Sequence, residues 1–250
     1  MRAVESARED RLFNDPLAQI FASMTDEPPT PMMRLPGSAE FLAIRTRFFD
    51  DQVRAMRARQ VVFLAAGLDC RAFRLDWPAG TRVFEVDLPG VFAFKEPVLE
   101  GAVPRCERVV VHADLRGDWP SALTAAGFDA SVATGWVAEG LLAYLTPDDA
   151  TLLFTTITTL SARGSVLAYD QMDASANDRH AVRAVDDTIR NLGGRLTTTK
   201  DDPVADLAAL GWAATVSRVP ALGETYGRPL PEAADPVASN ATMLVSAARG

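Results

Sequence analysis

The chain has 250 residues, 48% of them hydrophobic and 23% charged, and its formal net charge is −8. This length and composition are typical of one globular enzyme domain with a large core. The negative charge argues against nucleic-acid binding, which needs a basic surface. No apolar run reaches the ~18 residues that a membrane span needs, and the polar N-terminus is unlike a signal peptide. The two cysteines favour a reducing compartment, so the sequence predicts a cytoplasmic protein.

The N-terminal part, residues 1–59, is predicted to be helical. Two short helical pieces lie within residues 1–24, and Asp15 before a proline resembles the N-cap of the second piece. A proline-rich link at 27–31 separates them from a long helix at 38–59. Apolar residues recur along that helix at intervals of three and four, as one buried face requires.

Residues 60–88 are the part of the chain around which the rest is organised. An apolar strand at 61–64 ends in the small residues 65–67, which let a backbone turn sharply and approach a ligand. A second strand at 82–86 ends at Asp87. Strand, small-residue turn, crossover and strand followed by an acid are typical of a nucleotide-binding βαβ unit.

Strands and helices continue to alternate along the chain. The expected strands are 109–112, 131–138 and 166–170, and the expected helices are 90–100, 121–126 and 146–161. The acids Asp87, Asp114 and Glu139 each come just after a strand. Because parallel strands end at one edge of a sheet, we expect these three acids at the carboxyl edge, where such sheets bind ligands.

The C-terminal third has a different pattern. Residues 171–202 are polar and predicted to form a cap over the carboxyl edge of the sheet. A helix at 203–210 and a final pair of strands at 212–219 and 242–247 follow. The proline- and glycine-rich residues 220–240 are expected to form a long ordered loop.

Together these elements predict an α/β fold with a mostly parallel, doubly wound sheet of about seven strands. We expect a single domain over residues 1–250. Its parts are an N-terminal helical segment, a cofactor-binding core, a cap inserted after the fifth strand, and a C-terminal helix and strand pair, at 1–59, 60–170, 171–202 and 203–250.

Four motifs in order, GLDCRAFRL, FEVDLPGVFAFKEPVL, ADL and AEGLLAYL, resemble a known family. The chain is similar to the leucine carboxyl methyltransferase-like group of S-adenosylmethionine-dependent methyltransferases, which includes polyketide carboxyl O-methyltransferases. The likeness runs from Asp10 to Asp170 and is weak beyond Gln171. It implies the Rossmann-like class I methyltransferase fold and the cofactor S-adenosylmethionine, which leaves as S-adenosylhomocysteine.

The resemblance also implies residues for the amino-acid end of the cofactor. Arg45 would pair with the carboxylate of the methionine moiety, a task that suits a guanidinium fork. Glu139 would lie near the methionine amino group. The turn at Ala65 and Gly67 would bring its backbone close to the cofactor, and Arg2 would be a further carboxylate contact.

For the adenosine end, the resemblance implies that Asp87 accepts both ribose hydroxyl groups, with Leu88 beside it. Asp114 would bind the adenine amino group, and Leu115 would supply a backbone contact and an apolar wall. No metal ligands are expected, because the sequence has only two histidines and no cluster of cysteines and histidines with ligand spacing.

The chain departs from the family at two positions, since the family usually has glycine where Ala65 stands and threonine where Cys70 stands. Ala65 adds a methyl group at the turn. Arg71 and Arg74 are interpreted as structural, pairing with Asp69 or nearby carbonyl groups. Residues 50–51 are interpreted as a solvated part of the long helix with a salt-bridge partner.

Methyl transfer from a sulfonium depends mainly on positioning. A carboxylate acceptor is already ionised and needs no general base, whereas a phenol or alcohol would benefit from one, for which His180 or a carboxylate in the cap is the candidate. The sequence thus predicts an O-methyltransferase for a carboxyl or phenolic group of a small molecule of secondary metabolism. It names neither the acceptor nor the oligomeric state.

Three alternatives remain. In the first, the acceptor is the C-terminal carboxylate of a peptide or protein, as in the namesake of the family. In the second, the chain binds the cofactor without transferring a methyl group and acts as a binding protein or as the catalyst of a rearrangement. A nicotinamide-dependent dehydrogenase is disfavoured, because the first turn lacks two of the glycines of that motif.

Overall fold

The computed structural model of the protein describes residues 1–24, 31–173, 202–234 and 241–250. Most of the predicted cap, together with His180, lies outside the described residues. No helix in the described parts of the chain has the length and apolar character needed to cross a bilayer.

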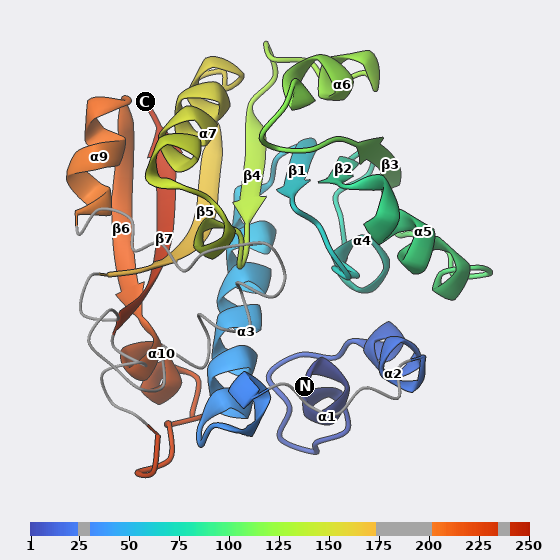
Figure 1. The fold of residues 1–250 in the computed structure, drawn as a ribbon, viewed down its shortest axis with the longest axis vertical. Helices are drawn as coiled ribbons and strands as arrows, with labels where there is room; N and C mark the ends of the chain where they lie inside the picture. The colour runs from blue at the N-terminus through green and yellow to red at the C-terminus, as the bar shows by residue number, and fades with distance from the viewer. Residues whose placement is uncertain (25–30, 174–201, 235–240) are drawn as a thin grey trace.

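Seven strands form one sheet in the order β3-β2-β1-β4-β5-β7-β6 (Figure 1). Strands β1 to β5 pair in parallel, and β7 lies antiparallel between β5 and β6. The strands are β1 (Gln60–Leu64), β2 (Arg82–Asp87), β3 (Glu107–His112), β4 (Thr134–Ala138), β5 (Val166–Met172), β6 (Trp212–Arg218) and β7 (Thr242–Arg249). The predicted α/β fold with a mostly parallel, seven-stranded sheet is confirmed.

Helices cover both faces of this sheet (Figure 1). Helices α3 and α10 pack on one face, and α6, α7 and α9 pack on the other. The helices are α1 (Arg2–Ser6), α2 (Pro16–Ser23), α3 (Ser38–Met56), α4 (Arg71–Arg74), α5 (Pro89–Val98), α6 (Trp119–Ala125), α7 (Pro147–Thr159), α9 (Pro203–Ala209) and α10 (Val219–Thr225), and the 3-10 helices are η1 (Pro31–Arg34) and η2 (Leu142–Tyr144).

The burial of β1 on both faces explains why its sequence is apolar without alternation. Val62 and Leu64 belong to the core on the side of α7, whereas Val61 and Phe63 belong to the core on the side of α3. All four are at most 3% exposed. A central parallel strand has no face toward water, so no polar residue is needed in it.

The side chains at the starts of α2 and α7 act as N-caps. Asp15 caps α2, where its carboxylate accepts a hydrogen bond from the backbone of Ala18 at 3.2 Å. Thr146 and Asp149 form a reciprocal capping box at the start of α7. Each cap binds backbone N–H groups that the first helical turn leaves without partners, so both starts are encoded locally.

The prediction of a long loop at 220–240 is wrong for the first part of that range, because α10 occupies Val219–Thr225. Proline fits the first turn of a helix, where its missing N–H is not needed, and Pro220 takes that place. Gly223 lets α10 lie close to α3: a Cβ there would be 3.1 Å from Cδ1 of Ile44 and 2.8 Å from the carbonyl oxygen of Arg228. The glycine that suggested a loop serves close helix packing.

The parallel arrangement brings the ends of β1, β2, β4 and β5 to one edge of the sheet. In Figure 1 the arrowheads of β4 and β6 point toward the lower part of the view, where α1, α2 and α10 lie. The loops after the strands and the N-terminal helices therefore surround the same edge, and the residues described next lie there.

Candidate cofactor-binding site

The turn after β1 is tied to the end of β2 through Asp87. One carboxylate oxygen of Asp87 accepts the backbone N–H of Gly67 at 2.6 Å, and the other accepts the N–H of Leu88 at 2.7 Å. The side chain is buried, and Gly67 has the left-handed conformation, with φ of 50°. Each oxygen of the carboxylate retains a lone pair for a ligand.

Ala65 also has a left-handed backbone, with φ of 52°. This conformation suits glycine, because a Cβ crowds the backbone there. The conformation explains why the family that the sequence resembles has glycine at this position. In this chain an alanine adopts this conformation, at a cost in backbone strain.

Three side chains from separate elements meet at the ends of β4 and β5. Nε of Arg45, from the middle of α3, lies 3.2 Å from Oε1 of Glu139, which follows β4. Nη1 of Arg45 lies 3.4 Å from Oδ2 of Asp170 in β5. Oδ1 of Asp170 accepts the backbone N–H of Gly140 at 2.6 Å. Arg45 is thus held between two acids at the carboxyl edge.

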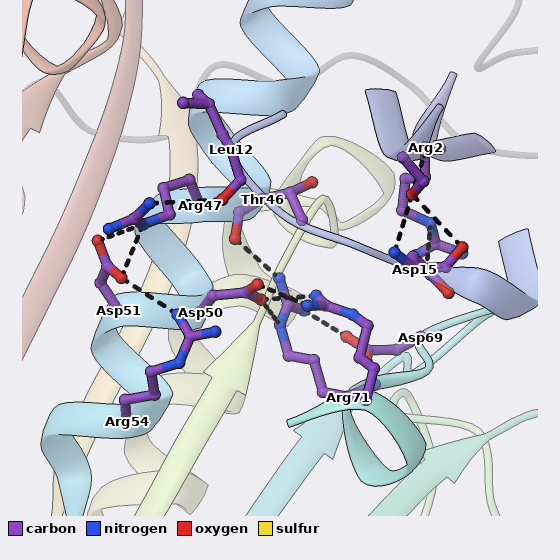
Figure 2. Close-up of polar contacts among 12 residues, drawn as sticks. Arg2, Leu12, Asp15, Thr46, Arg47, Asp50, Asp51, Arg54, Asp69 and Arg71 are labelled. Carbon is purple, nitrogen blue, oxygen red and sulfur yellow. Dashed lines mark hydrogen bonds and ion pairs between the residues drawn. The ribbon is translucent and has the colours of Figure 1, made fainter. Parts of the chain in front are cut away.

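Arg71 connects this group to α3 and to the turn after β1, and Figure 2 shows Arg71 beside Asp50 and Asp69. Its guanidinium binds Asp50 at 2.7 Å, Glu139 at 2.8 Å, the adjacent Asp69, and the backbone carbonyl of Thr46. The side chain is 2% exposed. The interpretation of Arg71 as a structural partner of Asp69 is confirmed, and the structure adds that it contacts a predicted cofactor residue.

The expectation that residues 50–51 are solvated is wrong for Asp50. Its side chain is fully buried and binds Arg71 and Arg74, the latter at 2.6 Å. Asp51, the next residue, lies on the outer side of α3 and pairs with Arg47 and Arg54 (Figure 2). Adjacent helical residues point in different directions, and the sequence alone did not show which acid faces inward.

The acids of the site have pKa values shifted in opposite directions. Burial by itself raises the pKa of Asp50, but Arg71 and Arg74 outweigh it and hold the pKa below its ordinary value. Asp69 has a lowered pKa for the same reason, with Arg71 as its main partner. Burial raises the pKa of Asp170, and Arg45 does not fully offset it. The fold therefore disfavours Asp170 as an anion, in contrast to Asp50 and Asp69.

The side chains expected at an adenine lie farther out. The carboxylate of Asp114 is 41% exposed and binds Arg116 at 2.7 Å, and this pairing lowers its pKa. Leu88 is 43% exposed, and Leu115 is half-buried. Leu88 directly follows β2, whereas Asp114 and Leu115 lie on the loop after β3, the strand on the side of β2 away from β1 and β4.

A cavity of about 170 Å³ opens beside the turn after β1 and the end of β4. Its charged lining consists of Arg2, Arg45, Asp69 and Glu139, and residues 63–68 and Val137 complete it. Pockets that hold a whole drug-sized ligand have about 300–1,000 Å³, so this cavity suits one end of a larger ligand. Two cations and two anions around one space fit a zwitterion, such as the amino-acid end of S-adenosylmethionine.

The hydrogen-bonding state of Arg45 supports that fit. Among the described residues its Nε has no hydrogen-bond partner, although the atom is buried. Oε1 of Glu139 lies 3.2 Å from this Nε without hydrogen-bond alignment, so the acid satisfies the buried donor only in part. Because Arg45 also lines the cavity, its guanidinium offers positive charge to an incoming carboxylate.

The N-terminal segment reaches the cavity through Arg2. Its Nε lies 3.3 Å from Asp15, and Nη2 donates to the carbonyl oxygen of Leu68. The same segment is anchored elsewhere by a buried pair, Glu5 with Arg228 at 2.9 Å. The suggested role of Arg2 as a cofactor contact stays a prediction, but its position at the cavity agrees with it.

Sequence reasoning missed Asp170 as a site residue and undervalued Arg71. The pattern that singled out Asp87, Asp114 and Glu139, an acid at the end of a strand, applies equally to Asp170. Arg71 had no such pattern, because its importance depends on three partners from different elements. His180, proposed as a base, lies outside the described residues.

Comparison with known proteins gives both a family and a fold. A family model described as leucine carboxyl methyltransferase matches residues 1–158. A predicted S-adenosyl-L-methionine-dependent methyltransferase of Streptomyces coelicolor is 44% identical over 244 residues, which cover 92% of this chain and 86% of that protein. Another such methyltransferase, of Saccharopolyspora erythraea, is 41% identical over an alignment of 263 residues, which covers 98% of this chain and 91% of that protein.

Solved structures with low sequence identity share the architecture. A DUF574 family protein of Streptomyces avermitilis matches with a TM-score of 0.64 at 15% identity, covering 100% of both chains. The magnesium protoporphyrin IX methyltransferase of Synechocystis, solved with bound S-adenosylhomocysteine, matches with a TM-score of 0.54 at 12% identity, covering 93% of this chain and 94% of that one. At such identities the likeness concerns the fold.

Proposed function

The chain belongs to the leucine carboxyl methyltransferase family, and we propose that it transfers a methyl group from S-adenosylmethionine to an oxygen atom of a small molecule. Relatives above 40% identity carry the name of S-adenosylmethionine-dependent methyltransferases, and that molecule is the cofactor. The acceptor group in this proposal is a carboxyl or a phenolic hydroxyl of a secondary metabolite.

One observation carries the proposal. Arg45 and Glu139, of opposite charge, line one cavity beside the turn that is bound to Asp87. In this proposal the guanidinium of Arg45 binds the carboxylate of the cofactor, and Glu139 accepts from its ammonium group. Asp87 accepts from the ribose hydroxyls with the lone pairs that the backbone N–H groups leave free.

The bound cofactor supplies a methyl group that is already activated by its positively charged sulfur. The residues of this chain then have to fix the donor in line with the acceptor, which is the main source of acceleration in such a displacement. The turn at 65–67 allows close approach of the backbone, and the charged groups hold both ends of the donor. The chain's contribution is positioning.

The acceptor chemistry favours a carboxylate. A carboxylate is ionised at neutral pH, whereas a phenol benefits from a general base. Among the described residues the only histidine is His112, which is exposed at the end of β3 and lies edge-on against Phe92. Carboxyl methylation therefore requires nothing that the described part of the site lacks, and His180 stays the candidate base for a phenol.

Calorimetry with S-adenosylmethionine and S-adenosylhomocysteine tests the proposal. The intact protein should bind both, and Asp87→Ala should weaken binding by more than about 100-fold, because two hydrogen bonds to a charged group contribute about 1.5–3 kcal/mol each. Asp148→Ala, at an exposed acid of α7, is the control and should leave the affinity unchanged. Absence of binding by the intact protein would contradict the proposal.

A transfer assay with a labelled methyl group then identifies the acceptor class. The panel should contain aliphatic and aromatic carboxylic acids, phenols and a peptide with a free C-terminal carboxylate. We expect label on small carboxylic acids or phenols. Label on the peptide alone would replace the small-molecule acceptor, and binding without transfer to any acceptor would favour a role that does not transfer methyl groups.

A further inference from the structure

Asp170 is a buried acid at the carboxyl end of β5 that the proposed reaction does not yet use. It is 8% exposed. One of its oxygens accepts the backbone N–H of Gly140 at 2.6 Å, and the other lies 3.4 Å from Nη1 of Arg45. It therefore contacts both the loop after β4 and the cation that lines the cavity.

The contacts of Arg45 leave part of its guanidinium available. Its distances to Glu139 and Asp170, 3.2 and 3.4 Å, exceed the 2.7–2.9 Å that is usual for charge-assisted hydrogen bonds. Within the described residues, its Nε has no acceptor with hydrogen-bond geometry. The two acids thus fix where the guanidinium lies, and their long distances compensate its positive charge only in part, which favours an incoming anion in the cavity.

Gly140 provides a second, indirect connection between Asp170 and Arg45, because it contacts both residues. Its backbone is left-handed, with φ of 67°, and a Cβ there would lie 3.6 Å from Nη1 and 3.7 Å from Nη2 of Arg45. The guanidinium therefore lies against the backbone of this turn. By accepting the N–H of Gly140, Asp170 holds the surface on which the Arg45 side chain rests.

Stability alone does not explain an acid at this place. Burial raises the pKa of Asp170 even with Arg45 beside it, which means that the fold disfavours its anionic form. Such costs are typical of functional sites. Glu139, the other acid next to Arg45, is bound by Arg71 through its second oxygen and so has a partner of its own.

We propose that Asp170 is a positioning residue for the amino-acid end of the cofactor. By fixing Arg45 and the turn at Gly140, it sets the direction in which the guanidinium presents its N–H donors to the cofactor carboxylate. This inference rests on the proposed function, because it takes a ligand with a carboxylate in the cavity as given. It adds a residue that acts through Arg45 and does not touch the adenosine end.

Asp170→Asn separates the two contacts. Asparagine has nearly the same size and keeps an oxygen that accepts the N–H of Gly140, but it removes the charge that faces Arg45. Calorimetry should compare two ligands, S-adenosylhomocysteine and 5′-methylthioadenosine, which lacks the amino-acid end. We expect about tenfold weaker binding of S-adenosylhomocysteine and less than about a twofold change for 5′-methylthioadenosine.

The control variant is Asp148→Asn, which makes the same charge change at an exposed position of α7 and should alter neither affinity. Equal weakening of both ligands by Asp170→Asn would overturn the inference, because it would show a general structural defect. Unchanged affinity for S-adenosylhomocysteine would overturn it as well. In both cases binding by the wild type would leave the proposed function standing, whereas no binding by the wild type would overturn both.

A second comparison tests whether Asp170 acts through Arg45. In an Arg45→Ala background, Asp170→Asn should change the affinity for S-adenosylhomocysteine by less than about twofold, because the group being positioned is gone. A full tenfold effect in that background would show direct action and overturn the inference. If circular dichroism shows that Asp170→Asn does not fold, Asp170→Glu replaces it with the same expectation, because its longer side chain displaces the guanidinium.

Discussion

Acids lie at or near the carboxyl ends of β2, β4 and β5, at the same edge of the sheet, but they are held by different partners. Asp87, the last residue of β2, is bound by backbone N–H groups of the loops beside it. Glu139 and Asp170, at β4 and β5, lie against the guanidinium of Arg45, and Glu139 also binds Arg71. The first acid is held locally, whereas the others belong to a group of charges drawn from α3, α4 and two strands.

This difference determines how far a substitution should act. A carboxylate held by its own loops is replaced without leaving another charge unpaired. A buried acid held by arginines shares each cation with other acids, so the loss of one member leaves several charges without a partner. We therefore expect local effects at the adenosine end of the site and coupled effects at the amino-acid end.

The largest effect is expected from Arg71→Met, which removes the cation shared by Asp50, Asp69 and Glu139. Removing one partner of a buried ion pair costs about 3–5 kcal/mol, so the unfolding free energy should fall by that amount. Denaturant unfolding measures it. Arg54→Met, at an exposed arginine that pairs with Asp51, is the control and should cost less than about 0.5 kcal/mol. Similar losses in both variants would contradict the coupled network.

The pH dependence of stability should distinguish two acids of the network. Asp50 has a lowered pKa, so its contribution is present above its ordinary value of 3.8 and is lost as the pH falls through the folded-state pKa. Asp170 has a raised pKa, so its contribution is present below 3.8 and is lost as the pH rises through the folded-state pKa. Chemical unfolding across this range should show Asp170→Asn gaining stability relative to wild type as the pH rises. A constant difference would contradict the raised pKa.

A smaller and local effect is expected from Asp114→Asn. Its exposed carboxylate binds only Arg116 among the described residues. Exposed pairs contribute about 0–1 kcal/mol, so stability should change by less than that. Affinity for S-adenosylhomocysteine should fall by about three- to tenfold, since one hydrogen bond to the ligand is weakened. A loss of stability as large as that of Arg71→Met would contradict the distinction between local effects at the adenosine end of the site and coupled effects at the amino-acid end.

The smallest effect is expected from Ala65→Gly. The left-handed backbone costs alanine about 1–2 kcal/mol, and the greater freedom of glycine in the unfolded chain offsets about 0.5–1 kcal/mol, so a net gain of about 0.5 kcal/mol is expected. Thermal unfolding measures it. Ala66→Gly is the matched control, because φ at Ala66 is not positive, and it should lose stability. A loss in both variants would show that Ala65 carries no strain.

Much of the fold was predictable from the sequence by itself. The apolar run of β1, the N-cap Asp15 and the capping box that starts with Thr146 follow from contacts within a few residues along the chain. The acids Asp87 and Glu139 follow strands, and parallel strands end at one edge, so their placement follows from the element order alone. Local patterns of this kind do not depend on the partners of each strand.

Only the tertiary structure decided the rest. The position of β7 between β5 and β6 depends on which strands pair, and chain order does not determine that. Arg45 meets Asp170 across 125 residues of sequence, and Asp50 is buried only because Arg71 of another helix faces it. The pairing of distant charges and the strain at a turn depend on packed geometry, because each needs atoms from several elements in one place. The sequence determined the residues at this edge of the sheet, and packing decided which of them act together.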